Sequence, residues 1–192
     1  FSFVNLHYYY FLQRNRGAVD YANTKDLGMF IISPNDKGGK LYEPSDRLNE
    51  LCAPLTPIQF NAKWCLNHPH IHTLSFGFTE ESHFEEMKGI FPLHVPLNRE
   101  ELEIECRMHN AILEDPRSAY EGFELGNDPS GINLAEVLRH RRMWKCYDQQ
   151  SFGFMRYNMF QDNGDWFPGT YATREAVQKI EQSISPVDID IK

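Results

Sequence analysis

Short apolar runs alternate with longer segments that carry one apolar face along the first ninety residues of the chain. Three runs, at residues 3–11, 29–33 and 72–78, are rich in aromatic or β-branched side chains and are too short for typical helices, which predicts β-strands. The run at 29–33 (MFIIS) is apolar almost throughout, a pattern typical of a strand covered on both faces in a parallel sheet.

Helices are predicted in the segments between these runs. Residues 15–25, 45–51 and 56–66 have helical patterns, and the last of them carries a continuous apolar stripe. After the third strand, Thr79 is the expected N-cap of a further helix whose first turn is acidic. Alternating strands and helices predict an α/β fold of parallel βαβ units, in which ligands bind near the carboxyl ends of the strands.

The pattern changes in the second half of the chain. A segment rich in Gly, Asn, Asp and Pro at residues 122–131 precedes a helical pattern at residues 134–147. The last residues have the composition of a loose tail. The expected organisation is an α/β part, a mostly helical C-terminal extension and a tail, at residues 1–92, 93–184 and 185–192.

Composition and charge narrow the possible partners. The chain has 192 residues, of which 41% are hydrophobic, and this is enough for a domain with a buried core. Its formal net charge of −8 argues against a nucleic-acid backbone as partner, so the expected partner is a small molecule or another protein. No apolar run approaches the roughly 20 residues that span a bilayer, and we expect no membrane partner.

The four cysteines are widely separated and form no C-x-x-C pair, which favours reduced thiols over a zinc site, an iron–sulfur cluster or a disulfide framework. A cytoplasmic protein is expected on this ground. The first residue, Phe1, already lies in a strand-like run, so we expect further sequence upstream. The cysteines are Cys52, Cys65, Cys106 and Cys146.

Three motifs in the first ninety residues resemble the last part of an aldo/keto reductase barrel. Residues 31–34 (IISP) followed by 37–41 (KGGKL) resemble the seventh strand and its glycine-bearing loop, and residues 3–8 resemble the sixth strand. Residues 60–69, with the strand that ends at Gly77, resemble the helix, His-Pro turn and eighth strand of that family. Their order and spacing are more specific than any single glycine loop.

The extension resembles the C-terminal region of a bacterial and archaeal branch of predicted aldo/keto reductase-like oxidoreductases, at residues 131–133, 155–158 and 166–169. Many relatives carry a ferredoxin-like cysteine cluster before the Gly-Ile-Asn segment at 131–133. This chain has no such cysteines, so no iron–sulfur cluster is expected. The resemblance implies a (β/α)8 TIM barrel of which this chain holds strands six to eight.

By this resemblance, the whole protein is an oxidoreductase that uses NADP or NAD, with NADP slightly preferred, and transfers hydride to or from a small carbonyl or alcohol substrate. The family's catalytic residues lie on the first four strands, and this chain contains none of them. The chain thus represents the cofactor-binding part. Its three strands would leave edges unpaired, so we expect pairing with a missing N-terminal half of the barrel or with a second copy.

The resemblance places cofactor contacts in the loop after the second strand and at the start of the helix after the third. Backbone amides of a glycine loop and of a helix N-terminus both favour a pyrophosphate. Asn5 stands where the family usually has a glutamine that binds the nicotinamide carboxamide. The expected cofactor-binding residues are Asn5, Ser33, Pro34, Asn35, Lys37, Gly38, Lys40, Gly77, Phe78, Thr79, His83, Glu86 and Met87.

Other interpretations of these residues stay open. The loop after Ser33 can be an ordinary solvated connection, the helix after Gly77 an ordinary capped helix, and the tyrosines at residues 8–10 part of the core. The histidines at 68, 70 and 72 lack a nearby carboxylate or cysteine, so no metal site is expected. The whole chain can also be a non-catalytic dinucleotide-sensing or protein-interaction module, or part of another βα-barrel enzyme.

Overall fold

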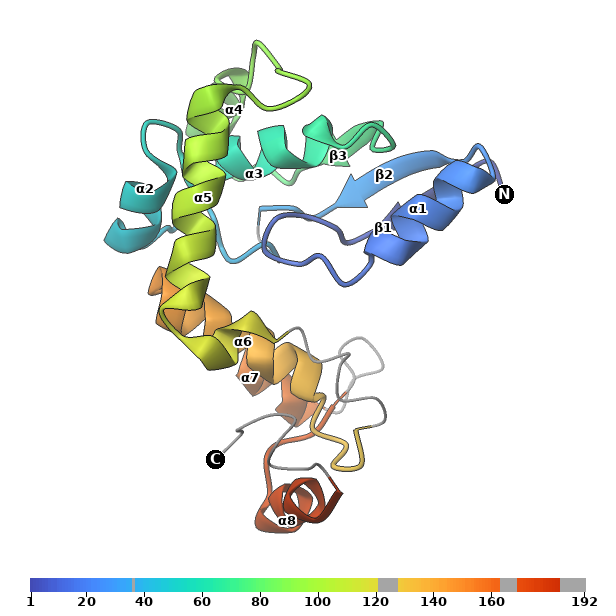
Figure 1. Cartoon of the computed structure of the whole chain (residues 1–192), viewed down its shortest axis with the longest axis vertical. Helices are drawn as coiled ribbons and strands as arrows, with labels where there is room; N and C mark the ends of the chain where they lie inside the picture. The colour runs from blue at the N-terminus through green and yellow to red at the C-terminus, as the bar shows by residue number, and fades with distance from the viewer. Residues whose placement is uncertain (36, 121–127, 163–168, 184–192) are drawn as a thin grey trace. The chain divides into compact units, whose positions relative to one another are not determined.

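A parallel three-stranded sheet in the order β1-β2-β3 organises the first part of the chain (Figure 1). The computed structural model describes residues 1–35, 37–120, 128–162 and 169–183. In the register of the sheet, Phe3 pairs with Gly28, and Phe30 pairs with Thr73. The strands are β1 (Phe3–Leu6), β2 (Gly28–Ile32) and β3 (Thr73–Ser75).

The two faces of this sheet differ. Met29 and Ile31 of β2 are buried, and helix α1 (Arg16–Thr24) packs against this strand. On the opposite face Phe30 remains 37% exposed and Phe3 55% exposed, with their ring centroids 5.2 Å apart. The apolar run predicts a strand covered on both faces, whereas the described residues cover only one. The α/β class with parallel strands is confirmed.

The first strand is shorter than the apolar run predicts. After Leu6 the backbone leaves the sheet and forms a turn in which Tyr9 and Leu12 exchange backbone hydrogen bonds. Tyr8, Tyr9 and Phe11 are each at most 2% exposed, so these rings belong to the core. Apolar character alone therefore predicted burial correctly but placed the end of the strand too late.

The helices between β1 and β3, and the helix that follows β3, form in the predicted segments, whereas the long helix that begins at Arg99 was not predicted individually. The Ser45 side chain accepts from the Leu48 N–H at the start of α2, and Thr56 forms a capping box with Gln59 at the start of α3. Further helices follow β3. Their bounds are α2 (Asp46–Cys52), α3 (Pro57–Asn67), α4 (Glu81–Lys88) and α5 (Arg99–Leu113).

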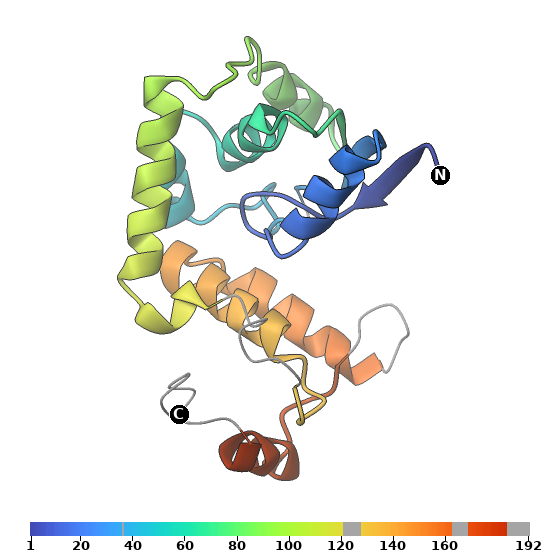
Figure 2. The ribbon, with the colours of Figure 1, turned by 45° about the vertical axis from the view of Figure 1, so that its right-hand side comes forward.

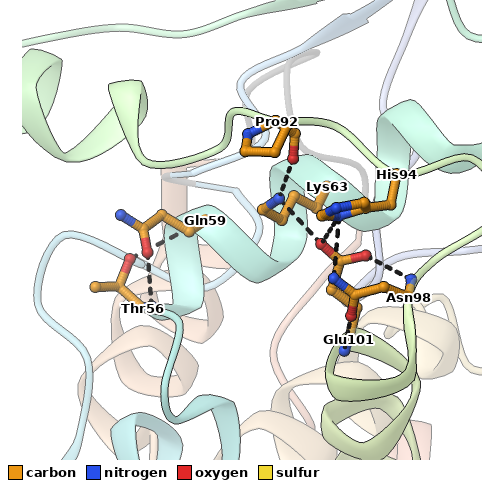
Figure 3. A network of polar contacts seen from close by, with 7 residues as sticks. All are labelled: Thr56, Gln59, Lys63, Pro92, His94, Asn98 and Glu101. Carbon is orange, nitrogen blue, oxygen red and sulfur yellow. Dashed lines mark hydrogen bonds and ion pairs between the residues drawn. The ribbon is translucent and has the colours of Figure 1, made fainter.

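A buried ionic network fixes the start of α5 (Figure 3). The Lys63 ammonium lies 3.0 Å from Glu101 Oε1 and donates to the Pro92 carbonyl over 2.8 Å. Glu101 also accepts from the Asn98 N–H, while the Asn98 side chain accepts from the Glu101 N–H. His94 Nδ1 lies 3.0 Å from the same carboxylate. The side chains of Lys63 and Glu101 are 6% and 2% exposed, so their charges are compensated almost entirely within the protein.

The chain divides into two compact units, Phe1–His109 and Asn110–Lys192, so the division falls inside α5 rather than at residue 92. In the second unit α6 and α7 pack side by side (Figure 2). The helix expected at 134–147 is confirmed. The elements of the second unit are η1 (Pro116–Ala119), α6 (Leu134–Tyr147), α7 (Gln150–Asn158), η3 (Met159–Asp162) and α8 (Arg174–Ser183).

The core of the second unit includes charged side chains. Glu136 Oε2 lies 3.5 Å from Arg139, 3.4 Å from His140 and 3.8 Å from Arg156, and all four side chains are less than 10% exposed. The Arg139 guanidinium also lies over the Phe152 ring. These interactions compensate the charges of Arg139 and Arg156 inside the unit and connect α6 to α7.

Candidate functional site

The candidate site lies at the carboxyl ends of β2 and β3. Ser33 follows β2 directly and adopts a left-handed backbone conformation, with φ of 51°, while its N–H donates to the Ser75 carbonyl at the end of β3. The loop after Ser33 thus begins at the point where the chain also leaves β3. The two segments in which the sequence predicts cofactor contacts therefore both begin at this edge of the sheet.

Tyr42 joins these two segments. Its hydroxyl accepts a hydrogen bond from Asn35 Nδ2 over 3.1 Å and donates one to the Gly77 carbonyl. Its ring stacks on the His83 imidazole, with ring centroids 3.9 Å apart and planes 24° from parallel. Tyr42 therefore brings together Asn35, Gly77 and His83, three of the expected cofactor-binding residues. The sequence analysis did not identify this tyrosine.

Asn61 of α3 holds the same loop from the other side. This side chain is fully buried, donates to the Pro34 carbonyl over 3.2 Å and accepts from the Tyr10 N–H over 3.1 Å. It therefore connects the turn after β1 to the loop after β2. Its signal in the sequence is a lone amide within the apolar stripe of α3, next to Phe60.

The glycine pair of the loop is constrained by the loop's own backbone. A Cβ added to Gly38 would lie 1.9 Å from the Pro34 carbonyl oxygen, so this position needs glycine for the loop's own turn. Gly39 has a φ of 132°. The expected cationic side chains are also engaged: Lys40 pairs with Glu43 over 3.1 Å, and Lys37 has interactions of its own.

A Gly38→Ala variant is expected to lower the free energy of unfolding by about 1–3 kcal/mol, because the loop must move to admit a methyl group. The matched control is Gly17→Ala in α1, where nothing lies within 4 Å of the added Cβ and alanine favours the helix. Urea unfolding of both variants measures the difference. Equal stability of the two variants would show that the close approach at Gly38 carries no constraint.

The start of α4 differs from the prediction at Thr79. The N-cap is Glu80, whose side chain makes no capping hydrogen bond, and the Thr79 hydroxyl instead lies 3.3 Å from His83 Nδ1. The prediction of Thr79 as N-cap is therefore wrong by one residue. Without a side-chain cap, the first N–H groups of α4 lack an intrahelical partner and can face an anion, although Glu80 and Glu81 oppose it.

Three other residues expected to bind the cofactor make contacts outside the Tyr42 cluster. Phe78 is 43% exposed and packs against Phe84, with ring centroids 5.7 Å apart. Met87 is only 7% exposed and belongs to the core, and the Glu86 carbonyl accepts from Gln59 Nε2. A direct contact of Met87 with an adenine ring is thus not supported, because its side chain faces inward.

Asn5 is separate from the two loops. It is exposed on the uncovered face of the sheet beside Phe30, its register partner, and its side chain makes no hydrogen bond to another described residue. Tyr8, by contrast, is buried against Trp64 of α3. Asn5 and Tyr8 are three positions apart, so even a continued strand would place their side chains on opposite faces.

Comparison of this chain with protein-family models, with curated proteins and with solved structures finds no match. Across the described ranges no group of three His, Cys, Asp or Glu side chains is arranged to hold a metal ion. Cys52, Cys65 and Cys146 are buried and Cys106 is exposed, all as free thiols. None of the helices in the described part combines the length and apolar character needed to cross a bilayer.

Proposed function

We propose that this chain forms the cofactor-binding part of an NADP- or NAD-dependent oxidoreductase of the aldo/keto reductase type. The observation that carries the proposal is the Tyr42 bridge, which joins the loop after β2 to the strand-to-helix segment after β3 through Asn35 and Gly77. These two segments are the ones for which the sequence resembles a dinucleotide site. In the proposal, the whole protein transfers hydride to or from a carbonyl or alcohol substrate, with catalytic groups on other strands.

The polar groups of this cluster suit the middle of a dinucleotide. The uncapped start of α4 offers backbone N–H groups and the positive end of the helix dipole to a pyrophosphate. Asn35 is 2% exposed, and its Oδ1 has no hydrogen-bond partner among the described residues, so it is an acceptor for a hydroxyl or amide. The buried Met87 does not suit an adenine contact, so the adenine end is left out of the proposal.

The uncovered sheet face supports a larger assembly. β1 and β3 are the edge strands of the sheet, and Phe3 of β1 and Phe30 of the central strand β2 are exposed on one face. An exposed apolar face with two unpaired edges favours the addition of further strands. In the proposal these strands belong to the remainder of a (β/α)8 barrel, and a second copy of this chain is the other possible source.

NADPH binding tests the proposal through Tyr42. Titration of the chain into NADPH, followed by the nicotinamide fluorescence, should give saturable binding that a Tyr42→Phe variant weakens by about tenfold, because the hydroxyl makes two hydrogen bonds. Tyr21→Phe is the matched control, because Tyr21 is 63% exposed on α1. This variant should bind NADPH as tightly as the unaltered chain does.

Two outcomes bear on the wider claim. Absence of binding to both NADPH and NADH, with circular dichroism that shows a folded chain, would contradict the cofactor proposal for this chain. If NADPH binds, oxidation of NADPH by added carbonyl compounds in the presence of the upstream half separates a reductase from a dinucleotide sensor. Binding without any turnover in that complete assembly favours the sensor.

A further inference from the structure

A pocket of about 380 Å³ lies in the first unit between α1, α3 and the turn that follows α3. Tyr8, Trp64, Asn67, His68 and His70 contribute to its wall. None of these residues belongs to the loop after β2 or to the start of α4, so the pocket is separate from the candidate dinucleotide site. Its volume falls within the range of small-molecule sites, which is about 300–1,000 Å³.

Ring side chains form much of the pocket wall. The Tyr8 and Trp64 ring centroids are 5.5 Å apart, and the His68 ring stands nearly perpendicular to Tyr8 at 5.8 Å. His70 continues the series at 5.3 Å from His68. Aromatic rings attract other rings in offset or edge-to-face arrangements at these separations, so the wall favours a flat aromatic ligand over an aliphatic one.

Two polar groups in this wall have no hydrogen-bond partner among the described residues. Tyr8 is 2% exposed, and its hydroxyl makes no hydrogen bond to any described residue. Asn67 Oδ1 is buried and likewise without a partner in the described part of the chain. Burial raises the pKa of Tyr8 to about 12, so its hydroxyl is protonated at neutral pH and can donate. The wall therefore presents one donor and one acceptor to a ligand, and a buried acceptor such as Asn67 Oδ1 is normally paired.

The charges around the pocket favour an uncharged ligand. Arg16 and Asp20 lie 3.8 Å apart with mostly exposed side chains, so their opposite charges compensate each other at this edge of the pocket. Burial lowers the pKa of His68, and the neighbouring His70 lowers it further, which keeps the His68 imidazole neutral at neutral pH. A ligand with a net charge would gain no uncompensated partner from these groups.

We propose that this pocket binds an uncharged, planar heteroaromatic molecule of nucleobase size. Its edge would donate a hydrogen bond to Asn67 Oδ1 and accept one from the Tyr8 hydroxyl, while its face packs against Trp64. The proposal does not depend on the function proposed above, because the two sites share no residue. Free adenine, which has both donors and acceptors and carries no phosphate, is the probe that tests it.

Calorimetric titration of the full chain with adenine should show saturable binding at one site. Tyr8→Phe removes only the hydroxyl and should weaken adenine binding about fivefold, and Asn67→Ala should weaken it by a similar factor. Tyr42→Phe is the matched control, because it removes a hydroxyl in the other cluster and should leave adenine binding unchanged. Circular dichroism of each variant establishes that the chain is folded.

The outcomes separate the pocket from the dinucleotide site. Weakening by Tyr8→Phe and Asn67→Ala but not by Tyr42→Phe supports the proposal, whatever the result for NADPH. Weakening by Tyr42→Phe alone would place adenine in the other cluster and overturn it. Absence of saturable binding to the folded chain would also overturn it and leave water as the partner of Tyr8 and Asn67.

Discussion

Replacing Lys63 with methionine is expected to lower the free energy of unfolding by about 3–5 kcal/mol, the usual cost of leaving a buried carboxylate without its cation. Glu101 is 2% exposed, and Lys63 is 3.0 Å away (Figure 3). Methionine has a similar length, so the change removes the charge and little of the packing. Urea unfolding monitored by circular dichroism measures the effect.

Two controls isolate the buried charge. Arg99→Met breaks the pair with Glu103 on the same helix, but Arg99 is 93% exposed, so a change within about 0.5 kcal/mol is expected. The double variant Lys63→Met/Glu101→Gln should recover part of the lost stability, because a neutral glutamine can still form the capping box with Asn98. Equal losses in Lys63→Met and Arg99→Met would contradict a role for burial.

The same network predicts a response to acid. Burial acts to raise the pKa of Glu101, but hydrogen bonds from the Asn98 N–H, His94 and Lys63 outweigh it and hold the pKa below its usual value of 4.5. Since the folded-state pKa is depressed, the carboxylate stabilises the fold above that value. This stabilisation is lost as the pH falls from 4.5 through the folded-state pKa. The double variant should lack this part of the acid sensitivity.

Asn61→Leu is expected to lower the free energy of unfolding by about 2–5 kcal/mol. The leucine fills a similar volume but removes the amide that pairs with both the Tyr10 N–H and the Pro34 carbonyl, and the loss of a buried polar partner costs about 1–3 kcal/mol per group. Because Pro34 begins the loop that carries Asn35, NADPH affinity should fall together with stability. Urea unfolding and NADPH titration measure the two effects separately.

The control for this variant is Asn49→Leu on the exposed side of α2, where a change within about 0.5 kcal/mol is expected and NADPH binding should stay the same. A loss of stability in Asn61→Leu without any loss of NADPH affinity would separate Asn61 from the proposed site. An equal loss in both variants would contradict the importance of the buried amide.

Local signals were sufficient for the parts of the fold that depend on neighbouring residues. Ser45 and Thr56 cap α2 and α3 at the predicted ends, and the apolar run at β2 forms the central strand. The end of β1 was predicted too late, because Tyr8 and Tyr10 are apolar enough for a strand but pack against α3 instead. Packing between distant segments overrides a local pattern there.

The candidate site was predicted only in outline for the same reason. The segments containing Asn35 and Gly77 were identified, but Tyr42 and Asn61 connect residues far apart in the sequence, and no short motif carries that information. Thr79 was expected as the cap of α4, yet its hydroxyl contacts His83. Which of these contacts Thr79 makes depends on the path of the backbone after β3. Such contacts become visible only once the strands are placed beside one another.

Helix α5 belongs to both compact units, since the division after His109 falls within Arg99–Leu113. A helix forms cooperatively, so loss of its first turn at Asn98 and Glu101 also weakens the turns that the second unit uses. We therefore expect the turns of α5 on either side of the division to depend on each other for stability. A change in the Lys63 network should therefore alter amide hydrogen exchange as far along the helix as Leu113.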